Sequence, residues 1–241
     1  MSTIRERNKA LILRAASEEF ADKGFAASKT SDIAAKAGVP KPNVYYYFKS
    51  KENLYREVLE SIIERIMQAS TPFNREGVPA EVLSSYIHAK IRISRDLPFA
   101  SKVFASEIMH GAPHLTTEQV EQLNKQARHN IDCIEGWISE GLVAPLDAHH
   151  LMFTLWAATQ TYADFDWQIA RVTGKLKLDD ADYEAAAKTI IRMVLKGCEP
   201  DRSSTQRALQ PGLNCGAKRP CGSQEPCRPH RVTARSSKAC E

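Results

Sequence analysis

A short segment near the N-terminus carries side chains that could read nucleic acid. Lys41 and Asn43 stand at the start of an expected helix, where Lys can donate to guanine O6 and N7 and Asn can pair with adenine. Three consecutive tyrosines add hydroxyl donors for phosphates and apolar surface: Tyr45, Tyr46 and Tyr47. Lys51, at the start of the next expected helix, could add a phosphate contact beside the positive end of that helix dipole. These residue types in this order favour a DNA-binding surface.

The segment that must position these side chains has the pattern of a helix-turn-helix. A short helix over residues 31–37 is expected to end at Gly38, because a residue without Cβ permits a left-handed turn. A second short helix is expected to begin within residues 40–42, since the fixed φ of proline suits a helix start. Such a unit places the first residues of its second helix in the major groove. The alternative is a plain helical hairpin with half-buried tyrosines.

The distribution of charge agrees with a polyanionic partner at this end of the chain. The net charge is +4 over 241 residues. Residues 1–51 contain ten Lys or Arg against five Asp or Glu, residues 52–198 contain 15 against 20, and residues 199–241 contain eight against four. A basic first fifth on an acidic body indicates that one end meets a polyanion, although a segment of this charge also arises by chance.

The rest of the chain is predicted to be all-α. Apolar residues recur at helical spacing in successive segments, of which one contains Val82, Tyr86, Ile87, Lys90 and Ile91. A regular first helix is expected to end at Gly24, Ser50 is expected to cap a long helix that stops at Thr71-Pro72, and two C-terminal helices are expected over 147–170 and 180–197. We therefore expect a DNA-binding domain at residues 1–50, a helical ligand-binding and dimerisation domain at 51–198, and a disordered tail at 199–241.

Composition excludes several other classes of protein. The chain is 43% hydrophobic and 26% charged, as in ordinary globular proteins, and no run approaches the roughly 18 apolar residues of a membrane span. The charged N-terminus runs directly into a helical pattern, so we expect no signal peptide and a cytoplasmic protein. The tail contains Cys215, Cys221, Cys227 and His230, but their spacing matches no common zinc site, so we expect neither metal nor cofactor.

The first part of the chain resembles the DNA-binding domain of the TetR family of bacterial repressors. The resemblance rests on dense matches over about 50 residues, from Phe20 and Gly24-Phe25 through Ile33-Ala34, Ala37-Gly38-Val39 and Val44 to Phe48 and finally Ser50 to Leu54. It implies binding to a double-stranded operator by a symmetric homodimer. By the resemblance, Ser28 and Lys29 are expected to touch phosphates and bases, and further contacts are expected from Lys41, Pro42, Asn43, Tyr45, Tyr46, Tyr47 and Lys51. Pro40 departs from the family, which often has a capping Ser there.

The second part is similar to pyrimidine-utilisation regulators of the same family. The similarity includes the segments 94–102, 111–113, 141–145 and 156–165, and it implies a planar heterocycle such as uracil or thymine as effector. Trp156 and Gln160 share a helix face, where an indole can stack on a ring and an amide can both donate and accept. Tyr162 and Asp164 are further candidates on other parts of that helix. The alternative is that Trp156 belongs to the core and Gln160 satisfies a backbone group or the dimer interface.

The remaining hypotheses differ in class. No HExxH, CxxC, glycine-rich phosphate loop or nucleophile motif is present, so we do not expect an enzyme. The principal prediction is a ligand-responsive regulator, most simply a repressor. Two alternatives remain open: a regulator of the same type with an unrelated small hydrophobic or aromatic effector, and a dimeric DNA-binding protein without a ligand.

Overall fold

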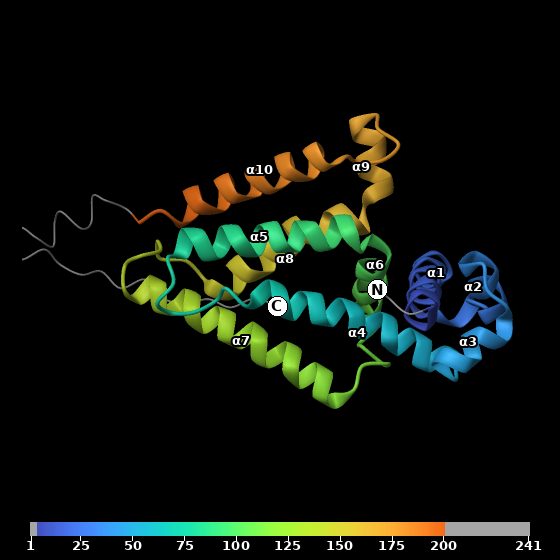
Figure 1. Ribbon diagram of the computed structural model, residues 1–241. Coiled ribbons are helices and arrows are strands. Elements are labelled where there is room, and N and C mark those ends of the chain that lie inside the picture. Colours follow the sequence, from blue (N-terminus) through green and yellow to red (C-terminus); the bar gives the residue numbers. More distant parts are fainter. Residues whose placement is uncertain (1–3, 201–241) are drawn as a thin grey trace, which may run out of the picture. The chain divides into compact units, whose positions relative to one another are not determined.

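The computed structural model describes residues 4–200, and this part of the chain is built from helices with no strand (Figure 1). The all-α prediction is therefore confirmed. The helices are α1 (Ile4–Ala27), α2 (Thr30–Ala37), α3 (Lys41–Phe48), α4 (Lys51–Ser70), α5 (Pro79–Asp96), α6 (Pro98–Met109), α7 (Thr117–Ser139), α8 (Ala148–Asp164), α9 (Asp166–Thr173) and α10 (Asp180–Cys198). Most of the tail for which disorder was predicted, residues 201–241, lies outside the described residues.

Helices α1–α3 lie together at one end of α4 (Figure 1). Gly24 breaks the regular path of α1 with φ 72°, ψ 168°, as its position in the sequence predicts. Gly38 is left-handed, with φ 67°, and turns the chain from α2 into α3. Ile12 and Phe20 of α1 and Ile33 of α2 are buried where these two helices pack. The helix-turn-helix expected from the sequence is therefore present.

Helix α4 connects this unit to the remaining helices. Ser50 caps its first turn by accepting a hydrogen bond from the amide of Asn53 at 3.1 Å, as expected. Leu54, Val58 and Ile62 recur every four residues and are at most 1% exposed. Through this face α4 packs against α5, α6 and α7 as well as α1. A change in the direction of α4 would therefore move α1–α3 relative to the other helices.

Helix α5 forms the centre of the second group of helices. It packs against α8 and α10, and Figure 1 shows α10 running beside it. Its buried residues include Leu83, Tyr86 and Ile87, each at most 1% exposed, and Trp137 of α7 is fully buried. The indole of Trp137 donates to the Arg75 carbonyl at 2.9 Å, which ties α7 to the loop before α5.

One expectation about helix boundaries is wrong, and one helix was not predicted. The single helix expected over 147–170 is divided at Phe165 into α8 and α9. The division coincides with Asp166, whose carboxylate accepts a hydrogen bond from Lys102 of α6 at 2.7 Å. The missed helix is α6, whose apolar residues lie on several sides of the helix and form no single apolar face. Several of these residues are only partly buried in the structure. This helix contributes to the internal cavity described next.

Candidate nucleic-acid interface and internal pocket

Helix α3 presents one polar, aromatic face and buries the other. Val44 and Phe48, 1% and 2% exposed, anchor it against α1, α2 and α4. Tyr45 and Tyr46 are 44% and 61% exposed. Lys41 and Pro42 are exposed at its first turn, while Asn43 and Tyr47 are half-buried. The helix therefore offers a surface on which most of the predicted contact residues are accessible.

One side-chain contact joins α3 to α2, and the start of α3 has no side-chain cap. The Tyr45 hydroxyl lies 3.0 Å from the hydroxyl of Thr30 at the start of α2. Pro40 occupies the N-cap position without a side-chain cap bond, as its departure from the family pattern predicts. Lys29 precedes α2 and is exposed, so it faces solvent near the same end of the unit.

Ser28 and Lys51 are placed differently from the other predicted contacts. Ser28 is 3% exposed, and its hydroxyl is within hydrogen-bonding distance of the carbonyls of Glu19 and Gly24, at 3.1 and 2.7 Å. The Lys51 ammonium donates to the carbonyls of Phe25, Ala26 and Ser28 at 2.9, 3.4 and 3.2 Å. It also lies 4.5 Å from the centre of the Phe25 ring. In this structure Ser28 bonds back to α1, and Lys51 joins the start of α4 to the end of α1.

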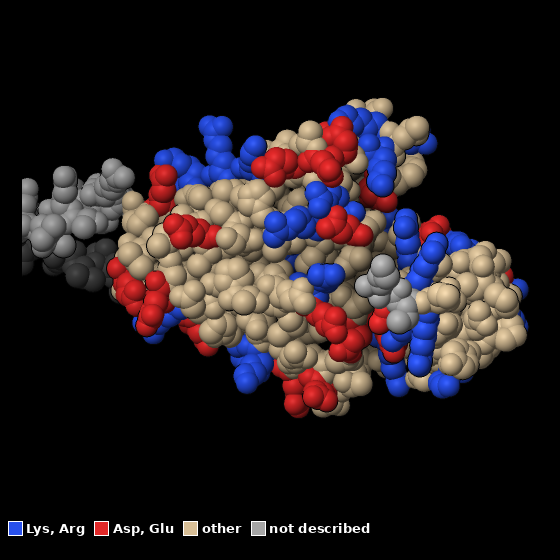
Figure 2. Space-filling model, in the orientation of Figure 1, with Lys and Arg blue, Asp and Glu red and all other residues tan. Residues whose placement is uncertain are grey.

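Basic side chains lie along a border of this unit. Figure 2 shows Lys and Arg side chains along the border of the surface formed by α1–α3. The described part of this basic segment keeps the same excess, ten Lys or Arg against five Asp or Glu up to Lys51. Such an excess attracts a phosphate backbone irrespective of its sequence.

A cavity of about 810 Å³ lies among α4, α5, α6, α7 and α8. Trp156, Gln160 and Asp164 line it from successive turns of α8, and Tyr86 and Lys90 line it from α5. Its wall is otherwise largely apolar and includes Ile66, Met67, Phe104, Ala105, Ile108, Leu115, Val120, Leu123 and Ala127. A mostly apolar chamber with a few polar groups is typical of small-molecule sites.

The hydrogen bonds in this cavity hold several of its polar groups in place. The Trp156 indole donates to the Tyr86 hydroxyl at 3.0 Å. The Gln160 amide donates to the Ser101 hydroxyl at 2.8 Å and, more weakly, to Asp164 at 3.4 Å. The same amide also donates to the Ser101 backbone carbonyl at 3.4 Å, which is the kind of partner that the alternative interpretation expected, but the Gln160 side chain still lines the cavity.

Lys90 is a lining residue to which sequence reasoning gave no function. It is 5% exposed, and burial lowers the pKa of its ammonium to about 8 against the opposing attraction of Asp164. Burial likewise raises the pKa of the Asp164 carboxyl. The sequence did indicate that Lys90 is buried, because this residue occupies a position in the apolar face of its helix.

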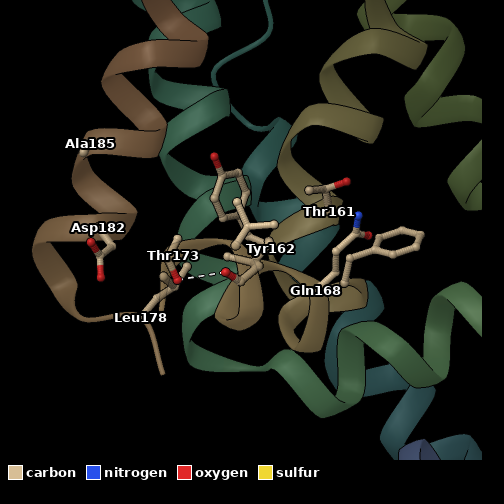
Figure 3. A pocket seen from close by; sticks show the side chains of 10 residues that line it. Thr161, Tyr162, Gln168, Thr173, Leu178, Asp182 and Ala185 are labelled. Carbon is tan, nitrogen blue, oxygen red and sulfur yellow. Dashed lines mark hydrogen bonds between the residues drawn. The ribbon is translucent and has the colours of Figure 1, made fainter. Parts of the chain in front are cut away.

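Tyr162 is separate from the other three predicted ligand residues. It lines a second, more open groove of about 600 Å³ between α8, α9 and α10 (Figure 3). Phe165, Ile169 and Val172 contribute to the same groove, and Figure 3 shows Tyr162 between α8 and α10. The structure therefore brings together Trp156, Gln160 and Asp164 but not Tyr162.

The described residues contain no group of His, Cys, Asp and Glu side chains that could hold a metal ion. None of the helices within residues 4–200 has the length and apolar character needed to cross a bilayer.

A helix-turn-helix with an exposed, aromatic second helix, joined to a helical body that contains a largely apolar cavity, is the arrangement of a DNA-binding transcriptional regulator. Residues 12–58 match the family described as bacterial regulatory proteins, tetR family, and residues 59–201 match the family described as YcdC-like protein, C-terminal region. The chain belongs to the TetR family of transcriptional regulators.

Individual relatives agree with this assignment. The HTH-type transcriptional regulator RutR of Escherichia coli K12 is 37% identical over 192 residues, which is 80% of this chain and 91% of that protein. Among solved structures, the TetR family regulator PfmR of Thermus thermophilus superposes with a TM-score of 0.61 at 18% identity, covering 83% of this chain and all of PfmR. AibR in complex with isovaleryl coenzyme A and operator DNA gives 0.55 at 18% identity, covering 78% and 97% of the two chains. At these identities the solved structures support the fold alone.

Proposed function

We propose that this protein is a repressor that binds a palindromic operator in the cytoplasm as a homodimer and is controlled by a small planar heterocycle such as uracil or thymine. The observation that carries the effector class is the cavity in which Trp156, Gln160 and Asp164 converge. An indole and an amide on one wall suit a flat ring with polar edges. The resemblance of this half of the chain to pyrimidine-utilisation regulators supports the same class.

The proposed DNA contacts are the accessible residues of the helix-turn-helix. They are Lys29, Lys41, Pro42, Asn43, Tyr45, Tyr46 and Tyr47. Ser28 and Lys51 would instead help to position these residues, because Ser28 bonds back to α1 and Lys51 joins α4 to the end of α1. In this proposal residues 1–50 bind DNA, whereas residues 51–198 bind the effector and form the dimer.

The proposed dimer interface is formed by the outer faces of α8 and α10. Phe153 on α8 and Met193 on α10 are 47% and 70% exposed, so the outer face of each helix carries a large apolar side chain that a partner helix would cover. Two-fold packing of these helices on their mates would give a four-helix bundle and, with it, two recognition helices related by symmetry. Sedimentation equilibrium at micromolar concentration tests this: wild type is expected at dimer mass and Met193→Glu as a monomer, with Val78→Glu in an exposed loop as the control.

One experiment tests the regulatory function as a whole. An operator is first selected from random double-stranded DNA with the full-length protein, and its affinity is then measured with and without uracil or thymine. We expect a palindromic consensus and a lower affinity in the presence of the effector. If no nucleobase changes either DNA affinity or thermal stability, the effector class is wrong. A different small aromatic compound, or no ligand at all, would then be the remaining explanation.

A further inference from the structure

Lys90 is a buried cation whose bonding capacity the protein leaves unused. It lies on α5, is 5% exposed and faces the cavity. Within residues 4–200 its ammonium has neither a hydrogen bond nor an ion pair, whereas the other lining lysine, Lys102, is bonded to Asp166 at 2.7 Å. Burying an ammonium without an acceptor is costly, because the group gives up its hydration and receives nothing in exchange. An occupant of the cavity that supplies an acceptor would remove that cost.

Asp164 completes the arrangement from the neighbouring helix α8, which packs against α5. Its carboxylate lies at the end of α8, lines the same cavity, and attracts the charge of Lys90. Even so, the two groups do not form an ion pair with each other in the described structure, and the carboxylate accepts only the long 3.4 Å bond from Gln160. A donor on α5 and an acceptor on α8, two helices that pack against each other, therefore face a common space.

The combined charge of the pair limits what can bind between them. A ligand with an anionic group alone would satisfy Lys90 but repel Asp164, and a cation alone would do the reverse. A neutral group with an acceptor next to a donor satisfies both. The cis-amide unit of a ring, O=C–N–H, has this arrangement on one edge, and its oxygen can accept while its N–H donates.

We propose that Lys90 and Asp164 together recognise a cis-amide edge of the effector, with Lys90 donating to the ring carbonyl and Asp164 accepting from the ring N–H. The effector is thereby a cyclic amide or imide, and Lys90 determines that specificity. This inference rests on the proposed function, since it concerns the same effector cavity. The indole of Trp156, already fixed by its bond to Tyr86, supplies a flat wall for the ring.

Calorimetric titration of full-length protein with uracil tests the proposal. Lys90→Met keeps the length of the side chain and removes its charge and donors, and we expect it to weaken binding at least tenfold. Asp164→Asn is expected to weaken binding by a similar factor. The double variant is expected to lose clearly less than the product of the two single losses, because both residues hold one amide group. Lys175→Met, at an exposed lysine that is bonded to Asp182 and does not line this cavity, is the control and is expected to remain within threefold of wild type.

A second ligand tests whether recognition depends on the ring N–H or only on the ring and its carbonyls. The compound 1,3-dimethyluracil keeps the ring and both carbonyls but has no N–H, so we expect it to bind at least tenfold more weakly than uracil to wild type and with little difference between wild type and Asp164→Asn. Thermal unfolding and operator affinity of each variant without ligand show that the fold is retained. Because Lys90→Met removes a buried charge, its thermal stability should be maintained or increased.

The outcomes distinguish this proposal from the proposed function. If uracil binds Lys90→Met as tightly as wild type, or if the two single losses simply multiply, the cis-amide assignment is overturned while uracil remains an effector. Equal binding of 1,3-dimethyluracil and uracil overturns it in the same way. If wild type binds neither uracil, thymine nor any other cyclic amide, both the proposed effector class and this inference fail.

Discussion

The hydroxyl of Tyr55 on α4 donates to the buried carboxylate of Glu107 on α6 at 3.0 Å. The same carboxylate accepts from the backbone amide of His114 at 2.5 Å and lies 3.1 Å from its imidazole. The Tyr55 ring in turn meets the ring of Phe25, 5.0 Å away, at the end of α1. Helix α6 also contributes Phe104 and neighbouring residues to the cavity wall. A continuous set of contacts therefore runs from the cavity to the DNA-binding unit.

Removing the Tyr55 hydroxyl tests whether this set of contacts couples the two sites. Tyr55→Phe keeps the ring but leaves Glu107 with one donor fewer, so we expect a loss of unfolding free energy of about 1–2 kcal/mol. The ratio of operator affinities without and with effector should fall severalfold, while affinity for the effector alone changes little. Fluorescence anisotropy with labelled operator, with and without uracil, measures this ratio.

Tyr162→Phe is the control for that experiment, because Tyr162 lines the other groove, away from this set of contacts. It should leave the ratio as in wild type. An unchanged ratio in Tyr55→Phe would show that the effector signal reaches α4 by another route.

Lys29→Ala and Lys51→Ala should weaken the protein in different ways. Lys29 is exposed, so its loss should lower affinity for all DNA sequences and reduce the slope of log affinity against log salt by about 1. Lys51 donates to three carbonyls, so its loss should reduce the unfolding free energy by about 1–2 kcal/mol. Salt titrations of operator binding and urea unfolding of both variants provide the comparison. If Lys51→Ala reduced the salt slope without lowering the unfolding free energy, Lys51 would contact a phosphate, as expected from the sequence.

Lys90→Met should make the effector-free protein more stable, and the gain should depend on pH. The pKa of Lys90 is about 8 in the folded protein and near 10.4 when unfolded. Unfolding therefore takes up a proton between these values, and the destabilisation due to Lys90, about 3 kcal/mol below pH 8, decreases as the pH rises toward 10. The stability difference between variant and wild type should accordingly narrow by about 1 kcal/mol from pH 7 to pH 9. Urea unfolding at both pH values measures it, and a difference that widens with pH would contradict the assignment.

Gly38→Ala should destabilise the helix-turn-helix through backbone conformation alone. Gly38 has φ +67°, and an added Cβ would meet no atom within 4 Å, so strain of the left-handed conformation, about 1 kcal/mol, is the expected cost. Gly197→Ala is the matched control, since its Cβ also meets nothing but its backbone lies in α10 without a positive φ. At Gly197, replacement by Ala should raise the unfolding free energy of the protein by up to about 1 kcal/mol. Thermal unfolding of the two variants should therefore shift in opposite directions.

The features that could be predicted from the sequence are those that depend on neighbouring residues. The break at Gly24, the turn at Gly38 and the cap at Ser50 each follow from one residue and its immediate surroundings. The division of α8 from α9 does not, because it coincides with a bond between Asp166 and Lys102 on another helix. Local patterns likewise gave no sign of α6, whose burial comes from several partners at once.

The same distinction applies to the residues of the candidate sites: some positions follow from the local sequence, and others depend on contacts between helices. Exposure of Tyr46 follows from its place on an amphipathic helix, whereas the inward position of Lys51 depends on carbonyls at the end of a different helix. Trp156 and Gln160 could be paired from their spacing. Lys90 could not be joined to Asp164, because only the packing of α5 against α8 brings both to one cavity.

The eight-residue length of α3 and its uncapped start at Pro40 have a consequence for hydrogen exchange. A helix this short is unstable alone, so it depends on Val44 and Phe48, whereas α4 has twenty residues, a Ser50 cap and buried residues along most of its length. The amides of α3 should therefore exchange through local opening well before those of α4. Because contact with the major groove would hold the same helix from its other side, bound operator should slow the exchange of α3 amides far more than that of α4 amides. The part of the protein that reads DNA would thus be the part whose order DNA most increases.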